Sequence, residues 1–181
     1  ATTAVAFNAD GEAPLGARAG ADLLLDLASG IGALEARNLF ALALRLAAEL
    51  AAAAEAVRVA AEIDFESRQD AAAWRDRLAG MLDRAADNAA LLAPTSPAAP
   101  SLARSRITAA RAQLGRDMNE VIGRLPSVQT ITPASSVSAW LIAQHVAGDD
   151  AAAVVPMLDD IVRRNRLAHP GRAEGAIEVL A

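Results

Sequence analysis

Residues 129–181 read Q-T-I-T-P-A-S-S-V-S-A-W-L-I-A-Q-H-V-A-G-D-D-A-A-A-V-V-P-M-L-D-D-I-V-R-R-N-R-L-A-H-P-G-R-A-E-G-A-I-E-V-L-A and contain four short elements. The first run, 129–132, is rich in β-branched residues and stops at Pro133, which predicts a strand. The last run, 177–180, alternates in part between apolar and polar residues and predicts a closing strand.

Two helices are expected between these strands. Ser135 or Ser136 can cap the first, whose apolar positions are Val137, Trp140, Leu141 and Val146. Gly148 and Asp149 separate it from the second, which carries Val154, Val155, Leu158, Ile161 and Val162. The second helix is expected to end near residues 163–165, and a turn follows at 169–171.

This order of strand, Ser-capped helix, Gly-Asp, helix, Asn, Pro, Gly and strand resembles a LysM module. Asn165 matches the Asn that follows the family's second helix, Pro170 the Pro of its turn and Gly175 the Gly before its last strand. The resemblance implies a compact βααβ unit, which binds glycans in other settings.

A second resemblance overlaps the first. R-N-R-L-A-H-P-G (164–171), together with Gly175 and I-E-V-L (177–180), is similar to the C-terminal signature of the DNA circularisation (circulation) proteins of Mu-like phage tails. F-E-S-R-Q-D-A-A-A-W-R-D-R-L-A (65–79) is similar to another segment of that family, so the match covers roughly residues 60–181. The resemblance marks as signature or contact residues Arg164, Asn165, Arg166, His169, Pro170 and Gly175.

The chain before residue 126 is predicted to be helical. A short helix is expected over 18–29, interrupted by Gly30 and Gly32, and a long one over 33–63 with a seam of Leu39, Leu42, Leu46, Leu50, Ala53, Val57 and Ala60. On its exposed face, residues 45 and 49, and residues 58 and 62, are spaced to form ion pairs. Ser67 and Asp70 predict that the next helix begins at this point, and it is expected to run to about residue 92. Prolines break the chain at 93–100, and a third long helix is expected over 101–125.

These elements predict a mainly α protein: a long antiparallel helical bundle followed by a small LysM-like βααβ module. The expected domains are an extended arm at 1–16, the bundle at 17–125 and the module at 127–181, with the boundary at Pro126.

Composition limits the function classes. The 181 residues are 54% hydrophobic but only 3% aromatic, and the net charge is −5, so nothing draws the chain to nucleic acid or anionic membranes in general. There is no Cys, which excludes thiolate chemistry and disulfides. Charged residues interrupt the most apolar stretch, 39–61, so no membrane span is expected.

Catalytic and metal-binding patterns are weak. His145 and His169 have no second His or Cys near them in sequence, as a metal site would require. Adjacent carboxylates at 149–150 and 159–160 point about 100° apart on a helix and fit capping or a solvated face better than acid–base catalysis. No Gly-rich phosphate loop is present. We therefore expect no enzyme activity, no cofactor and no metal.

Four arginines form a local basic patch at the end of the chain: Arg163, Arg164, Arg166 and Arg172. Contact with an anion such as DNA phosphate is one interpretation, which the family's name suggests. Cations also complement the C-terminal end of a helix, and no aromatic residue accompanies the patch to stack on bases. We favour a structural or protein-contact role.

A glycan groove in a LysM module would lie between loops 133–136 and 167–172. Glycan-binding members usually carry Gly-Asp-Thr-Leu at the first loop, where this chain has A-S-S-V (134–137). This difference favours a structural use of the module.

The expected function is therefore that of a structural component of a phage tail or phage-tail-like particle, in the baseplate hub region. It would act by oligomeric assembly, as a homo-oligomeric ring in contact with neighbouring tail or baseplate proteins. Its expected location is the virion tail, after assembly in the bacterial host cytoplasm. The alternatives are a DNA-end-binding or circularisation protein and a peptidoglycan-binding LysM-type module.

Overall fold

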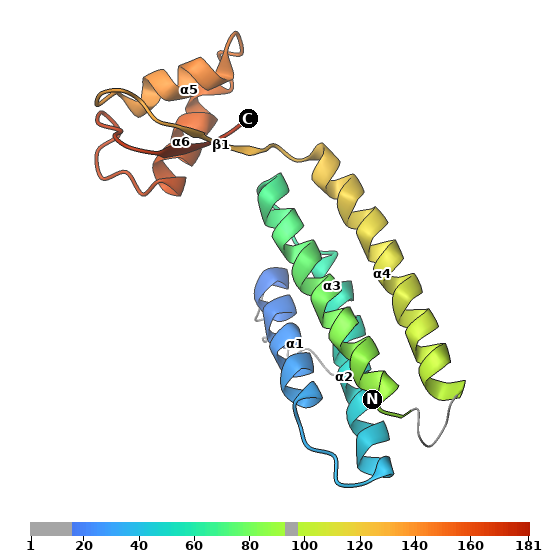
Figure 1. Cartoon of the computed structure of the whole chain (residues 1–181). Helices are drawn as coiled ribbons and strands as arrows, with labels where there is room; N and C mark the ends of the chain where they lie inside the picture. The colour runs from blue at the N-terminus through green and yellow to red at the C-terminus, as the bar shows by residue number, and fades with distance from the viewer. Residues whose placement is uncertain (1–15, 93–97) are drawn as a thin grey trace, which may run out of the picture. The chain divides into compact units, whose positions relative to one another are not determined.

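The computed structural model describes residues 16–92 and 98–181 and shows a mainly helical protein with a small two-stranded antiparallel sheet (Figure 1). This confirms the predicted mainly α class. The described residues fall into two compact units: a helical unit, residues up to 64 with 72–120, and a C-terminal unit, residues 65–71 with 121–181. The arm predicted at 1–16 lies outside the described residues except for Gly16.

Four helices follow one another in chain order and alternate in direction, as in a helical bundle (Figure 1): α1 (Ala17–Gly32), α2 (Leu39–Ala60), α3 (Arg68–Ala90) and α4 (Ala98–Arg124). The helix predicted over 18–29 is α1, which continues through Gly30 to Gly32 without interruption. The helix predicted from residue 33 begins only at Leu39, because Asn38 is extended and its side chain accepts a hydrogen bond from the Ala41 N–H at 2.8 Å.

The start of α3 agrees with its predicted cap. The Asp70 N–H donates to the Ser67 hydroxyl at 3.2 Å, and the Glu66 N–H donates to the Asp70 carboxylate at 3.3 Å. The first bond satisfies one of the N–H donors that a helix start leaves open, and the second ties the residue before the cap to the first turn.

Alanine lines much of the core of the helical unit. The apolar residues of α2 that are buried are Leu46, Ala52, Ala53, Ala56 and Ala60. The larger buried residues come mainly from α3 and α4: Trp74, Leu78, Met81, Leu82, Ile107, Leu114 and Met118. The predicted α2 seam is wrong at Leu39, which is 47% exposed, since the buried stripe turns to the alanine side of the helix.

Glu49 corrects another expectation. It is buried rather than exposed, and Asn88 of α3 donates to its two carboxylate oxygens at 2.9 and 3.0 Å. Arg45 instead donates to the Leu34 carbonyl at 2.6 Å. The ion pair predicted between Arg58 and Glu62 is present at 3.1 Å.

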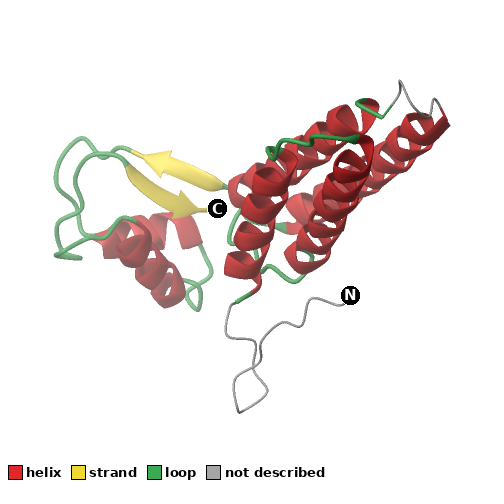
Figure 2. Cartoon of the chain, turned by 90° about the horizontal axis from the view of Figure 1, so that it is seen from below, coloured by secondary structure: helices red, strands yellow, loops and turns green. Residues whose placement is uncertain are grey.

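The C-terminal unit has the predicted order strand, helix, helix, strand: β1 (Val128–Ile131), α5 (Ala139–Ala147), α6 (Val154–Arg164) and β2 (Ile177–Leu180). The strands pair antiparallel from Val128 opposite Leu180 to Ile131 opposite Ile177. Both helices lie on one side of this sheet (Figure 2). The first strand begins and ends one residue earlier than predicted, and the closing strand has its predicted bounds.

Large aliphatic side chains fill this second core. Ile161, Ile177 and Val179 are almost completely buried, with Ile142 and Val154 beside them. On β2 the exposed Glu178 alternates with its buried neighbours, as expected of a strand with one face in a core.

The predicted details of α5 need two corrections. Its cap is Ser138, whose hydroxyl accepts from the Trp140 N–H at 3.2 Å, rather than Ser135 or Ser136. Its buried stripe is Ala139, Ile142 and Ala143, whereas Trp140 and Leu141 are 46% and 57% exposed. On α6, the predicted apolar position Val155 is likewise 53% exposed.

Candidate functional site

Asn165 joins the end of α6 to β2. Its side-chain amide donates to the Ile161 carbonyl at 2.9 Å and to the Glu178 carbonyl at 2.8 Å. Its side-chain oxygen accepts from the Glu178 N–H at 2.8 Å. One side chain therefore satisfies a helix-end carbonyl and both backbone groups of an edge-strand residue, which is a structural role.

Arg164 lies in an ion-pair cluster rather than facing solvent. Its guanidinium contacts the Asp160 carboxylate at 3.1 Å, and each side chain is 14% exposed. It also contacts Glu66, just before α3, at 3.4 Å. The hydrogen bond to Asp160 raises the pKa of Arg164 above its usual value, with the nearby carboxylates adding to the effect. These contacts hold Arg164 in place.

The other arginines of the predicted anion patch differ in their surroundings. Arg163 pairs with Asp160 at 2.6 Å, and Arg172 pairs with Glu174 at 3.2 Å. Arg166 is exposed, has φ of 49°, and has no side-chain hydrogen bond or ion pair to the described residues. Three of the four cations thus have carboxylate partners, which lowers the positive charge available to a phosphate.

The remaining signature residues shape the chain between α6 and β2. The Pro170 carbonyl accepts a hydrogen bond from the Ala139 N–H at 2.8 Å, and the His169 carbonyl accepts from the Arg172 N–H at 2.9 Å. Gly175 has φ of 78°, a conformation that side chains other than glycine rarely adopt. These contacts use backbone atoms, and the imidazole of His169 is exposed.

Loops 133–136 and 167–172, which would flank a glycan groove, are held together by backbone hydrogen bonds between the residues that follow each loop. Val137 and Ala173 form an antiparallel bridge with hydrogen bonds of 3.1 and 2.7 Å. The bond from Ala139 to Pro170 lies next to this bridge. The loops therefore brace each other, and rigid loops suit a docking face as well as a binding groove.

The His, Asp and Glu side chains are spread over the described ranges, 16–92 and 98–181. No group of three or more His, Cys, Asp or Glu side chains there is arranged to hold an ion. His145 and His169 are both exposed.

Exposed apolar residues near the start of α2 were not predicted from the sequence. Leu34, in the loop before α2, and Leu39, Phe40 and Leu44 of α2 are 60%, 47%, 77% and 61% exposed, and we call these four residues the α2 apolar corner. Phe40 and Leu44 are four residues apart and share a helix face. That spacing is visible in the sequence, but the dense leucines of this region conceal which face is buried.

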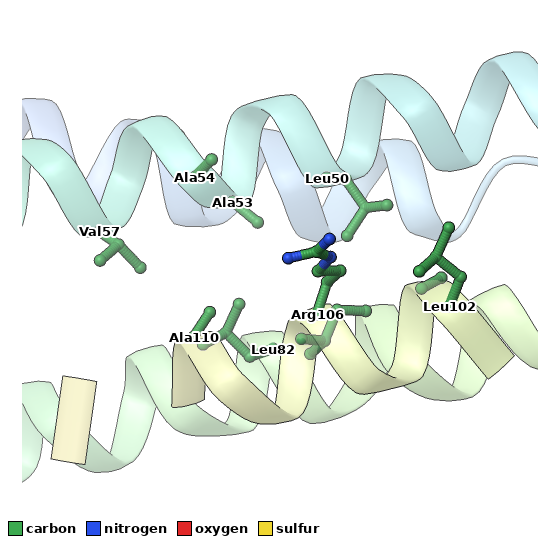
Figure 3. A pocket seen from close by; sticks show the side chains of 10 residues that line it. Leu50, Ala53, Ala54, Val57, Leu82, Leu102, Arg106 and Ala110 are labelled. Atoms are coloured by element: carbon green, nitrogen blue, oxygen red, sulfur yellow. The ribbon is translucent and has the colours of Figure 1, made fainter. Parts of the chain in front are cut away.

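A groove in the helical unit was also missed. It lies between α2, α3 and α4 and has a volume of about 630 Å³ (Figure 3). It depends on residues more than 50 positions apart, such as Leu50 and Leu102, and no local spacing indicates it.

None of the described helices is both long and apolar enough to cross a membrane. No protein-family model matches the chain, and a search of curated proteins finds no match.

Proposed function

We propose that this chain is a structural subunit that acts by assembly in a phage tail or phage-tail-like particle, in the baseplate hub region. The observation that carries the proposal is the α2 apolar corner. Exposed apolar clusters of this kind mark surfaces that other proteins cover. Burying these four side chains at a subunit contact contributes on the order of 5 kcal/mol per subunit before the entropy of association is subtracted.

The tail assignment rests on the sequence resemblance over residues 60–181. The C-terminal unit is proposed to be a LysM-like module used as a rigid structural part. Its β1–α5–α6–β2 order and the Asn165 bridge between α6 and β2 support this use. The assembly would be a homo-oligomeric ring in contact with other tail or baseplate proteins, formed in the bacterial host cytoplasm and retained in the virion tail.

The two alternatives have less support. A DNA-end-binding protein requires free cations, and Arg163, Arg164 and Arg172 have carboxylate partners. A peptidoglycan-binding module requires an open groove between loops 133–136 and 167–172, beside which the Val137–Ala173 bridge draws the chain together.

Light scattering on the full chain tests the proposal. We expect an oligomer of defined mass that added duplex DNA does not change. Replacing Phe40 and Leu44 together by Glu places charges in the contact and should yield monomer. Ala109→Glu on the exposed face of α4 is the matched control and should leave the mass unchanged.

A monomeric chain at all concentrations would contradict the assembly role. A chain that forms complexes only with DNA, and loses them steeply as salt rises, would support the circularisation role instead. Cosedimentation with insoluble peptidoglycan would support the glycan-binding role.

A further inference from the structure

The groove of the helical unit has an unusual lining. Nine of its ten lining residues are Ala, Val, Leu or Ile, and the tenth is Arg106. Leu50 and Val57 contribute from α2, Leu82 from α3, and Leu102 from α4 (Figure 3). A volume of about 630 Å³ lies in the range of small-molecule sites.

Arg106 supplies the only charge in this lining. Figure 3 shows its side chain reaching from α4 toward α2, beside Leu50. The guanidinium has no hydrogen bond or ion pair to the residues that the structure describes, although Arg111, five residues along the same helix, pairs with Asp83 at 2.9 Å. Arg106 is exposed, and its guanidinium is a fork of donors matched to a carboxylate, so it is available to hold one anionic group.

The length of the groove sets the size of its occupant. Its lining runs over residues 50–57 of α2 and 102–110 of α4, which at about 1.5 Å per residue is roughly 10–12 Å. A zigzag alkyl chain built from C–C bonds of about 1.5 Å advances roughly 1.3 Å per carbon. The groove therefore accommodates roughly eight to ten carbons.

We propose that this groove binds an aliphatic carboxylate of roughly eight to ten carbons, with the carboxylate on Arg106 beside Leu50 and the alkyl chain between α2 and α4 toward Val57 (Figure 3). The lining offers one charge and otherwise only aliphatic surface, which matches a ligand with one anionic head and no other polar group. The ligand site is independent of the proposed assembly role.

Titration of the full chain with sodium decanoate, below its micelle concentration, tests the site. Methyl NMR should show shifts concentrated on Leu50, Leu82, Leu102 and Ile107. Fully burying a methylene group would raise the affinity roughly fourfold. Because the groove is open and buries each methylene only in part, we expect the affinity to rise roughly twofold per added carbon from hexanoate to decanoate. Decanol should bind more weakly than decanoate, because it lacks the charge.

Two pairs of variants locate the head and the chain. Arg106→Gln should weaken decanoate roughly three- to tenfold and leave decanol unchanged. Arg104 is an exposed neighbour outside the groove, so Arg104→Gln should leave the affinities for decanoate and decanol unchanged. Ala54→Trp fills the groove and should abolish both, whereas Ala51→Trp, exposed on the same helix but outside the lining, should not.

Several results would overturn the proposal. They are shifts spread over the α2 apolar corner instead of the groove, equal weakening by Arg104→Gln and Arg106→Gln, and an affinity that does not depend on chain length. Circular dichroism of each variant verifies that the helices remain folded.

Discussion

The helical unit and the C-terminal unit bury different side chains. On α2 most of the buried residues are alanines, while Phe40 and Leu44 remain in solvent. The C-terminal unit places Ile161, Ile177 and Val179 inside a much smaller core. Alanine allows helices to approach closely, so the helical unit holds together without all of its large side chains. These are then available for contacts with other molecules.

Polar contacts differ in the same way. In the C-terminal unit, two amide side chains bond to the backbone of other elements: Asn165 spans α6 and β2, and Gln69 exchanges two 3.0 Å hydrogen bonds with Val128. In the helical unit, exposed side chains bond to each other across helices, as in the pair between Arg77 and Asp22 at 2.6 Å. Contacts to a fixed backbone lose less side-chain freedom per bond formed. The stability of the C-terminal unit should therefore depend more on each of these residues.

The largest expected effect is in the C-terminal core. Ile161→Ala removes a fully buried side chain and should destabilise the C-terminal unit by about 2–5 kcal/mol. Val155→Ala, at a half-exposed position of the same helix, should cost about 0.5 kcal/mol or less. Hydrogen exchange by mass spectrometry separates the units, and the peptides of α5, α6 and β2 should lose protection. Equal loss throughout α1–α4 would show that the two cores are not energetically distinct.

A smaller effect is expected at Asn165. Asn165→Ala removes three hydrogen bonds and leaves backbone groups of Ile161 and Glu178 without their partner, at a cost of about 2 kcal/mol. The matched change in the helical unit is Asn119→Ala, which removes one exposed bond from Arg75 at 2.9 Å and should cost less than about 0.5 kcal/mol. Urea denaturation measures both, and exchange at the Glu178 amide reports the Asn165 contact directly. Similar costs at the two positions would contradict the contrast between backbone and side-chain contacts.

Two glycines of α1 should respond with opposite signs. A Cβ at Gly32 would lie 2.7 Å from a carboxylate oxygen of Glu49, which Asn88 holds in place, so Gly32→Ala should destabilise the helical unit by about 1–2 kcal/mol. A Cβ at Gly30 meets nothing within 4 Å, and Gly30→Ala should stabilise the helix by about 0.5–1 kcal/mol. Thermal unfolding of the two variants measures the sign and size of each change in stability. Stabilisation by both changes would mean that Glu49 moves aside easily.

The element order was predictable from sequence because periodicity and turn residues are local signals. Gly148 placed the end of α5, Pro133 placed the end of β1 to within one residue, and Ser67 with Asp70 placed the start of α3. The buried face of a helix is harder to predict where alanine competes with larger side chains. In α5 the small stripe of Ala139 and Ala143 is buried, and Trp140 is exposed.

Contacts between residues distant in the chain were not predictable. Glu49 appeared solvated because its partner, Asn88, lies 39 residues away. The arginines at the end of the chain appeared as one patch, since the sequence does not show that Arg164 also faces Glu66, 98 residues earlier. The Arg106 groove combines three helices and has no local signal.

The smallest expected effect concerns an exposed ion-pair cluster on α2. Arg58 contacts Glu55 at 2.7 Å and Glu62 at 3.1 Å, and its hydrogen bond to Glu55 lowers the pKa of that carboxyl below its ordinary value. A lowered folded-state pKa stabilises the fold above the unfolded-state pKa, and the contribution is lost as pH falls through the folded-state pKa. Arg58→Ala should therefore raise the pKa of Glu55 toward its ordinary value and reduce stability slightly at neutral pH.

The difference in free energy of unfolding between Arg58→Ala and the unchanged chain should vanish in acid, where Glu55 is protonated in both proteins. It should also shrink in high salt, because the ion-pair cluster is exposed. Carboxyl NMR titration of Glu55 measures the pKa, and Arg104→Ala is a control without a carboxylate contact among the described residues. Arg164→Ala extends the test to the C-terminal unit, where the pair between Arg164 and Asp160 is mostly buried. The loss of stability caused by this variant should depend much less on salt concentration. An equal salt response at Arg58 and Arg164 would remove the distinction between the two units' polar contacts.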